Sequence, residues 1–124
     1  MKYVGSKNRH SSEILSLILK NRKVDQVYVE PFVGGFNMVD KVSGRRIASD
    51  NNHYLIELFK AIQSGWIPPS EITEDQYKDI RINKDKHPAE LVGFVGFGCS
   101  YSGKFFGGYA RGNDSKGNGR NYCL

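Results

Sequence analysis

The apolar positions of residues 11–23 recur with the period of an α-helix. Ser11 and Ser12 are candidate N-cap residues, because a hydroxyl can accept a hydrogen bond from a free amide of the first turn. The segment ends in basic residues, which suit the negative end of the helix dipole. The sequence therefore predicts an amphipathic helix over residues 11–23. Its apolar face is formed by Ile14, Leu15, Ile18 and Leu19.

Three further helices are predicted downstream. The first has an asparagine cap and a glycine stop signal, and its apolar face is formed by Leu55, Ile56, Phe59 and Ile62. The second opens with the capping-box pattern TEDQ, and the third carries Pro88 in its first turn, where proline is well tolerated. These helices are predicted over residues 51–65, 73–82 and 88–98.

Two segments predict strands, and the first of them is rich in β-branched residues. KVDQVYVEPF alternates valines and predicts a strand that ends near Glu30, and RRIASD at residues 45–50 predicts a second, shorter strand. Strand, glycine turn, helix, strand and helix in this order are typical of an open parallel sheet. We therefore expect an α/β fold with a helix between the two strands.

Length and composition restrict the class of protein. The 124 residues fit one domain or part of one, and 39% hydrophobic residues argue against intrinsic disorder. Cys99 and Cys123 belong to no Cys-x-x-Cys pair and have too few histidines nearby for a zinc site, so we expect no metal and free thiols in a reducing, cytoplasmic setting. No segment resembles a signal peptide or approaches the roughly 18 apolar residues of a membrane span.

The positive charge is concentrated at both ends of the sequence. Residues 1–23 hold six Lys and Arg against one Glu, and residues 101–124 hold four against one Asp, whereas the centre holds eight against eleven acidic residues. If the ends meet in space, they could follow a polyphosphate backbone such as DNA. Ordinary solvated surface charge is the alternative.

The segment after Gly98 is rich in glycine and has no regular period, which predicts a loop or hairpin arm. We therefore divide the chain at residues 1–95 and 96–124. In the arm, aromatic residues alternate with basic ones, a combination that offers stacking surfaces and phosphate contacts to nucleic acid. In the alternative, the same aromatics pack as a small satellite core. The residues are Tyr101, Phe105, Phe106 and Tyr109 with Lys104 and Arg111.

The glycine pair that follows the first predicted strand lies where an open α/β sheet binds its ligand. Asp50 ends the next strand 16 positions after Gly34, near the interval at which an acid reaches ribose hydroxyls. This spacing favours an adenosine-containing ligand. Glu30 would repel a phosphate group, so a cofactor that carries a cation, such as S-adenosylmethionine, fits better. A purely structural turn is the alternative.

Three motifs together resemble the Dam-type, or D12-class, DNA adenine-N6 methyltransferases: KYVGSKNRH at 2–10, VEPFVGGF at 29–36 and ASDNNHYLIELFKAIQ at 48–63. Enzymes of this family transfer a methyl group from S-adenosylmethionine to the exocyclic amine of adenine in DNA, often in restriction–modification. The resemblance implies part of a Rossmann-like methyltransferase sheet with flanking helices and a glycine-rich C-terminal arm. The implied cofactor residues are Tyr3, Lys7, Glu30, Phe32, Gly34, Gly35 and Asp50.

The resemblance also implies a DNA-contacting segment. GFGCSYSGKFFGGYAR at 96–111 is similar to the part of the family that leads into target recognition. The implied DNA-contacting residues are Arg9, Lys104, Tyr109 and Arg111.

One motif of the family is absent from the sequence. The family carries an Asp-Pro-Pro-Tyr type motif whose acid and aromatic ring hold the target adenine, but the sole Pro-Pro here lies in GWIPPS, where Ile67 replaces the acid and Ser70 the aromatic residue. No catalytic residue is therefore assigned. We expect an amino-terminal portion of such an enzyme, with a second chain completing the sheet as one option.

Two other functions remain open. The first is a non-catalytic fragment that binds cofactor or DNA as a decoy, a regulator or a relic. The second is a fragment of a dinucleotide-binding oxidoreductase, which Glu30 and the missing third glycine of the G-x-G-x-x-G pattern disfavour.

Overall fold

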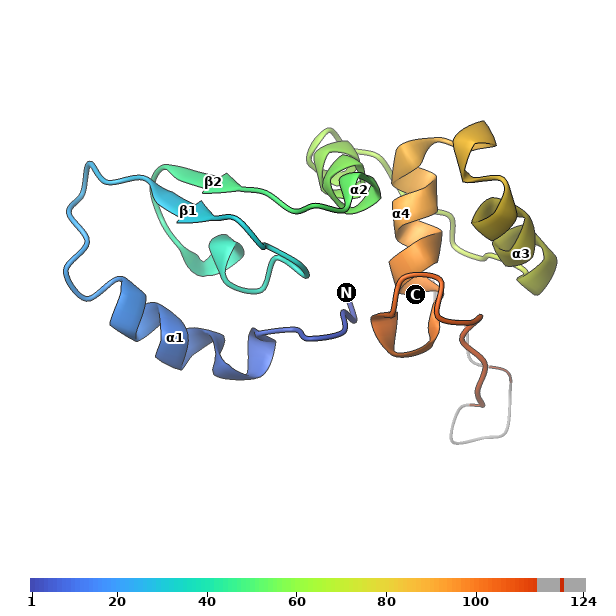
Figure 1. Ribbon diagram of the computed structural model, residues 1–124, viewed down its shortest axis with the longest axis horizontal. Coiled ribbons are helices and arrows are strands. Elements are labelled where there is room, and N and C mark those ends of the chain that lie inside the picture. The colour runs from blue at the N-terminus through green and yellow to red at the C-terminus, as the bar shows by residue number, and fades with distance from the viewer. Residues whose placement is uncertain (114–118, 120–124) are drawn as a thin grey trace. The chain divides into compact units, whose positions relative to one another are not determined.

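A computed structural model describes residues 1–113 and 119 of the protein (Figure 1). The chain forms two compact units: unit 1 comprises Met1–Val4 and Asn52–Leu124, and unit 2 comprises Gly5–Asn51. Lys116, Arg120 and Cys123, which the sequence analysis assigned to the basic arm and to the free thiols, lie outside the described residues. The division at residue 95 stays a prediction.

Unit 2 is built around a two-stranded parallel sheet. Strand β1 (Tyr28–Glu30) pairs with β2 (Arg46–Ala48), and the two strands lie side by side in Figure 1. Val29 faces Ile47 in the register. Beyond the strands, the amide of Val33 donates to the carbonyl oxygen of Ser49 at 2.9 Å, which keeps the two chain segments together past their ends. The predicted mixture of helices with a parallel strand pair is confirmed.

The helix expected between β1 and β2 was a wrong prediction. Residues 31–45 contain turns and one short 3₁₀ helix, Val39–Lys41, but no α-helix. Gly34 and Phe36 have positive φ values of 51° and 61°, which a right-handed helix does not allow. The guanidinium of Arg46 then binds the carbonyl oxygens of Val39, Asp40 and Val42. These bonds satisfy main-chain acceptors that a longer helix would otherwise have used.

Helix α1 (Ser11–Ile18) is shorter than predicted. It follows a 3₁₀ turn at Asn8–His10, so His10 occupies the N-cap position and the assignment of Ser11 or Ser12 as the cap was wrong. The predicted basic last turn is also wrong, because residues 19–23 lie beyond the helix. Ser11 and Leu15 are its buried residues, whereas Ile18 is 54% exposed.

Beyond the end of α1, Arg22 is held by main-chain atoms of two turns. Its guanidinium donates to the carbonyl oxygens of Gln26, Ser43 and Arg45, at 2.8 to 3.2 Å. These bonds fix the turn before β1 against the turn before β2. The sequence pattern around Arg22 gives no indication of these main-chain partners.

Unit 1 contains the three predicted helices: α2 (His53–Gln63), α3 (Glu74–Ile82) and α4 (Ala89–Gly98). Their predicted start signals are present. The Asn52 side chain accepts from the Leu55 amide, and the capping box of α3 is complete. Pro88 takes the N-cap position of α4, one residue before its predicted place. The buried residues of α2 are Leu55 and Leu58, while Ile62 of the predicted face is 46% exposed.

Helix α4 is the centre of the unit 1 core and packs against α2 and α3 (Figure 1). It is apolar on most of its circumference, as a helix covered on several sides must be. The buried core residues are Ile72, Tyr77, Ile80, Val92, Val95, Cys99 and Phe106.

The contact between α4 and α2 depends on a glycine. A Cβ atom at Gly93 would lie 2.2 Å from the main-chain oxygen of Tyr54 and 3.0 Å from the Leu58 side chain. A Cβ at Gly98, on the same helix, would meet only the Phe94 ring at 3.5 Å, which is an ordinary contact. The two helices are therefore in close contact at Gly93.

We predict that Gly93→Ala lowers the free energy of unfolding by about 1–2 kcal/mol, because the overpacking cost exceeds the gain in helix propensity. Gly98→Ala, the matched control, should be neutral or slightly stabilising. Urea denaturation of both variants measures the difference. Equal effects of the two substitutions would contradict the close approach at Gly93.

The glycine-rich arm is attached to this core over its described part. An antiparallel bridge joins Ser100 and Tyr109, and Phe106 and Ala110 are buried. The Phe105 ring contacts Phe97 and Phe106 at centroid distances of 4.8 Å. The alternative left open from the sequence, a separate satellite core of arm aromatics, does not form: Phe106 is part of the main unit 1 core and Phe105 packs against it. Tyr101 is 69% exposed.

Within residues 1–113 and 119, no helix is both long enough and apolar enough to cross a membrane.

Candidate functional site

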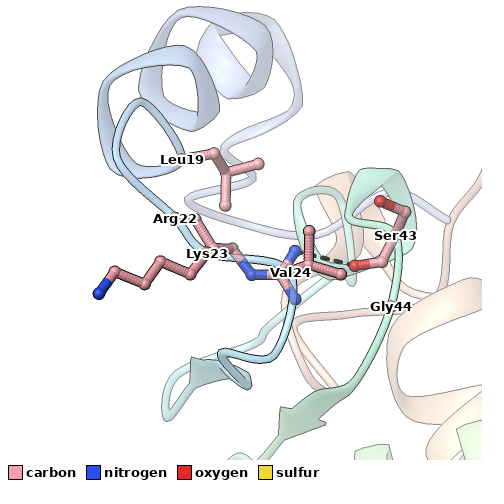
Figure 2. Close-up of a pocket in the computed structure, with 6 residues that line it drawn as sticks. All are labelled: Leu19, Arg22, Lys23, Val24, Ser43 and Gly44. Atoms are coloured by element: carbon pink, nitrogen blue, oxygen red, sulfur yellow. Dashed lines mark hydrogen bonds between the residues drawn. The ribbon is translucent and has the colours of Figure 1, made fainter.

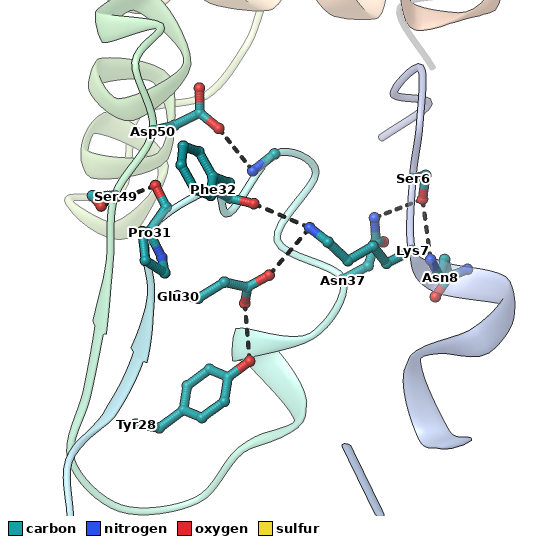
Figure 3. Close-up of polar contacts among 11 residues, drawn as sticks. Ser6, Lys7, Asn8, Tyr28, Glu30, Pro31, Phe32, Asn37, Ser49 and Asp50 are labelled. Carbon is teal, nitrogen blue, oxygen red and sulfur yellow. Dashed lines mark hydrogen bonds and ion pairs between the residues drawn. The ribbon is translucent and has the colours of Figure 1, made fainter. Parts of the chain in front are cut away.

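The carboxyl ends of β1 and β2 bring the glycine turn and Asp50 together. The main-chain amide of Gly34 donates to Oδ2 of Asp50 at 3.0 Å (Figure 3). Gly34 is buried and has a φ of 51°, a left-handed conformation that favours glycine. Asp50, which follows β2, therefore fixes the position of the glycine turn that follows β1.

Lys7 and Glu30 form an ion pair beneath the same turn. Nζ of Lys7 lies 3.6 Å from Oε1 of Glu30 and donates to the carbonyl oxygen of Phe32 at 3.1 Å (Figure 3). The Glu30 side chain is 8% exposed and that of Lys7 is 43% exposed. The hydroxyl of Tyr28 donates to Oε2 of Glu30 at 3.4 Å. A buried carboxylate thus receives a cation on one oxygen and a phenol on the other.

Polar contacts fasten the loop that carries Lys7 to the segment after the turn. The Asn37 amide donates to Oγ of Ser6 at 2.8 Å, and Lys41 bonds to Oδ1 of Asn8 and to the hydroxyl of Ser11. These contacts link positions about thirty residues apart in the sequence. The loop is therefore held by the protein's own side chains.

Phe32 provides an apolar surface at the turn. The residue is 76% exposed although it is a large aromatic, and its carbonyl is held by Lys7. Exposed aromatic rings beside polar groups are typical of sites that bind flat or apolar ligand parts. Together, these residues offer a carboxylate, a tight glycine turn and an exposed ring within unit 2.

The structure brings together most of the residues implied for the cofactor. Within unit 2 these are Lys7, Glu30, Phe32, Gly34, Gly35 and Asp50. Tyr3 belongs to unit 1, where its ring stacks on that of Phe97 with 5.3 Å between centroids. Whether any of these residues contacts a cofactor stays a prediction.

Sequence reasoning missed Tyr28, Ser6 and Asn37. Tyr28 had a detectable signal, since it stands two positions before Glu30 and a strand directs such residues to one face. Ser6 and Asn37 had none, because they meet only when the loop folds onto the turn.

The residues proposed for DNA contact differ in how they are held. Arg9 and Lys104 are exposed, and within the described part of the chain their side chains make no hydrogen bond or ion pair. The hydroxyl of Tyr109 donates to the carbonyl oxygen of Ile72 at 2.7 Å. Arg111 pairs with Glu74 of α3, with Nε to Oε2 at 3.1 Å. The hydrogen bond from Arg111 holds the pKa of the Glu74 carboxyl below its ordinary value, and Glu74 in turn raises the pKa of Arg111.

A hollow of about 340 Å³ lies in unit 2 at the beginnings of the strands, which is the edge away from the glycine turn (Figure 2). Arg22 lines it, but its guanidinium is already bound to main-chain carbonyl oxygens. Ligands of open α/β sheets bind at the opposite, carboxyl edge. The hollow is therefore not a candidate for the cofactor. The lining residues are Leu19, Arg22, Lys23, Val24, Ser43 and Gly44.

A metal centre has no ligand set in the described residues, where no group of three or more His, Cys, Asp or Glu side chains could hold an ion.

Burial raises the pKa of Tyr28 above its ordinary value of 10.0, and the neighbouring Glu30 carboxylate adds to the increase. The unfolded chain then releases the phenol proton at a lower pH than the folded chain does. The stability contributed by protonated Tyr28 is therefore present below pH 10.0 and is lost as the pH rises through the folded pKa.

We predict that Tyr28→Phe is less stable than the wild type by about 0.5–1.5 kcal/mol at neutral pH, the usual value of one hydrogen bond. This difference should shrink as the pH rises above 10.0. Denaturant unfolding of both proteins across that range measures it, and the other tyrosines cancel in the comparison. A difference that stays constant with pH would contradict the account.

Comparison with known proteins gives one family. The family model described as D12 class N6 adenine-specific DNA methyltransferase matches residues 3–92, well over half of the 124 residues. The matched range contains Tyr3, all of unit 2, and helices α2 and α3. No curated protein and no solved structure matches the chain.

Proposed function

The chain belongs to the D12 class of N6 adenine-specific DNA methyltransferases, and on this basis we propose that unit 2 forms the S-adenosylmethionine-binding part of such an enzyme. The observation that carries the proposal is the hydrogen bond from the Gly34 amide to Asp50, which fixes a tight turn beside a carboxylate at the strand ends. In the proposed fold, β1 and β2 are two strands of a Rossmann-like sheet.

The residues present fit the cofactor by their chemistry. Asp50 would accept hydrogen bonds from the ribose hydroxyls, since a carboxylate matches a pair of hydroxyl donors. The Gly34–Gly35 turn would admit the methionine part close to the main chain, and the exposed Phe32 ring would cover one side of it. When bound, S-adenosylmethionine supplies a methyl group on a positively charged sulfur.

Glu30 and Lys7 would together support the proposed cofactor site. Because Lys7 lies against the buried Glu30 carboxylate, the charge of that carboxylate is balanced within the protein. Lys7 also binds the Phe32 carbonyl, so the pair supports the chain segment that carries the Phe32 ring. The proposed role is to hold Phe32 and the turn in place.

Methyl transfer requires groups that hold the target amine, and the 124 residues contain no Asp-Pro-Pro-Tyr sequence. We therefore assign cofactor binding to this chain and expect no methyl transfer from these residues alone. The second candidate function, a non-catalytic binding fragment, is favoured by the same absence. Labelled methyl transfer to duplex DNA separates the two when a second chain that carries the Asp-Pro-Pro-Tyr motif is added, because transfer by the mixture would exclude the non-catalytic function and an inert mixture would count against the enzyme.

Ligand selectivity tests the cofactor assignment. Calorimetric titrations with S-adenosylmethionine, S-adenosylhomocysteine, ATP and NAD should show binding of the first two, with a dissociation constant between about 1 µM and 1 mM, as is usual for enzyme substrates. ATP and NAD should bind more weakly, because the turn lacks the third glycine of the G-x-G-x-x-G pattern with which such turns bind a pyrophosphate. Tighter binding of NAD would support the oxidoreductase alternative and overturn the proposal.

We further propose that Arg9 and Lys104 contact DNA phosphates, since both side chains are exposed and make no hydrogen bond or ion pair with the residues that the structure describes. A cation that binds a DNA phosphate releases a counterion. Lys104→Ala should reduce the slope of log affinity against log salt by about one unit. Lys78→Ala removes the same charge but from a lysine that pairs with Glu74 and Asp75, and should leave the slope unchanged. DNA affinity that does not vary with salt would contradict this interface.

A further inference from the structure

Two side chains of the arm bind to the beginning of α3, within unit 1. The hydroxyl of Tyr109 donates to the carbonyl oxygen of Ile72 at 2.7 Å. The Arg111 guanidinium binds both carboxylate oxygens of Glu74, with Nε at 3.1 Å from Oε2. A guanidinium that binds a carboxylate through two hydrogen bonds has the geometry in which even an exposed ion pair contributes to structure.

The preceding turn of the arm, residues 100–109, is bound to Tyr77 of α3. The Tyr77 hydroxyl shares a hydrogen bond with the Ser100 hydroxyl at 2.8 Å and accepts from the Gly108 amide at 3.2 Å. Tyr77 is 2% exposed and belongs to the unit 1 core. Both ends of the turn are therefore attached to α3, and Lys104 lies between them in the chain.

We propose that Tyr109 and Arg111 are positioning residues: they hold the arm on α3 so that Lys104 is presented to a DNA phosphate, and they do not bind DNA themselves. This inference rests on the proposed function, in which Lys104 contacts DNA. It changes the role of Tyr109 and Arg111, which the family resemblance placed among the DNA-contacting residues. The polar groups of both side chains already bind protein partners, and a direct DNA contact would have to break these bonds.

Glu74→Gln is the first test, and Asp75→Asn is its matched control. Each substitution removes one carboxylate from the first turn of α3, and each of these carboxylates pairs with Lys78. Glu74 is the one that also binds Arg111. Because both variants reduce the repulsion of DNA phosphates by one negative charge, their comparison isolates the contact with the arm.

Glu74→Gln should bind a short adenine-containing duplex about twofold to fivefold more weakly than Asp75→Asn does, the loss expected from one exposed ion pair. If Arg111 bound DNA directly, Glu74→Gln would free its guanidinium. Duplex binding as tight as that of Asp75→Asn, or tighter, would therefore overturn the inference. Fluorescence anisotropy measures both affinities. Exchange of the Ala110 amide, which donates to the Cys99 carbonyl at 2.9 Å, should become faster in Glu74→Gln and not in the control.

Reversal of the ion pair distinguishes a positioning role from a general loss of structure. Arg111→Glu alone places two carboxylates together and should weaken duplex binding. The double variant Glu74→Arg/Arg111→Glu restores an ion pair between the arm and α3, so it should recover much of the affinity. A direct phosphate contact predicts no recovery, because residue 111 then carries a negative charge.

Tyr109→Phe tests the second contact, since it keeps the ring and removes the hydroxyl that binds Ile72. It should weaken duplex binding, whereas Tyr101→Phe, which changes a ring that is 69% exposed, should not. A Tyr109 ring that stacked on a base would retain its affinity as phenylalanine, and that result would contradict the positioning role.

The proposed DNA contact and this inference fail in different ways. If Lys104→Ala leaves the salt dependence of duplex binding unchanged, the phosphate contact of Lys104 is wrong and the inference fails with it. If Lys104→Ala lowers the salt dependence but Glu74→Gln binds like Asp75→Asn, the positioning role alone is wrong and the proposed function stands.

Discussion

Replacing Asp50 by alanine is expected to weaken S-adenosylmethionine binding by about tenfold to a hundredfold, because a hydrogen bond to a charged group contributes about 1.5–3 kcal/mol. The substitution removes the proposed ribose acceptor. It also leaves the buried Gly34 amide without its acceptor oxygen, so the glycine turn loses its anchor. Calorimetric titration measures the affinity, and denaturant unfolding measures the accompanying loss of stability.

Asp50→Asn separates the two consequences. The asparagine carbonyl can still accept from Gly34, so the turn should remain and stability should be close to that of the wild type. Binding should nevertheless weaken by about tenfold, because the charged acceptor is lost. Asp40→Ala removes an exposed carboxylate from the same unit and should change neither property. An Asp50→Asn variant that binds like the wild type would contradict a direct contact with the ribose.

Lys7→Met is expected to lower the free energy of unfolding by about 1–3 kcal/mol and to weaken cofactor binding as well. Methionine keeps much of the length of the side chain but removes the cation beside a carboxylate that is 8% exposed. The Phe32 carbonyl loses its donor at the same time. Urea denaturation and cofactor titration of the variant measure the two effects.

The double variant Lys7→Met/Glu30→Gln tests the cause of that loss. A glutamine at residue 30 is neutral and needs no cation, so adding it to Lys7→Met should recover part of the stability. Cofactor binding should not recover, because the Phe32 carbonyl still lacks Lys7. If the two substitutions are simply additive in stability, the Lys7–Glu30 pair is not energetically coupled and the account of this pair is wrong.

The fold could be predicted wherever the signal is local. The helix starts at Asn52 and Thr73 are encoded within four residues, and both caps form as the sequence indicates. The strand that ends at Glu30 follows from a cluster of β-branched residues, and the second, shorter strand lies before Asp50 as predicted. Short-range hydrogen bonds and side-chain preferences suffice for such elements.

The errors arise where distant groups decide the local structure. Arg22, beyond the end of α1, binds carbonyl oxygens up to 23 positions away, and Arg46 binds carbonyl oxygens of a 3₁₀ turn where a helix was expected. In the sequence, both arginines look like ordinary surface charges. Their partners are main-chain carbonyl oxygens, which every residue type carries, so no sequence pattern predicts these contacts.

The candidate site also has one contact that could be predicted from the sequence and one that could not. The meeting of Gly34 and Asp50 follows from the rule that parallel strands end at one edge, and the structure contains that contact. The pairing of Lys7 with Glu30 could not be predicted, because the sequence suggested a cofactor cation as the partner of Glu30. Burial of Glu30, together with Tyr28, is a property of the folded sheet that only the structure provides.

The most direct test of the central claim is an amide NMR titration of the wild-type chain with S-adenosylmethionine. Binding at the strand ends predicts saturable shifts of the Gly34 and Gly35 amides, and of the Asp50 amide beside them. The same signals should stay unchanged when the cofactor is added to Asp50→Ala. Absence of any shift, or shifts confined to residues around the Arg22 hollow, would contradict the assignment of the cofactor to this turn.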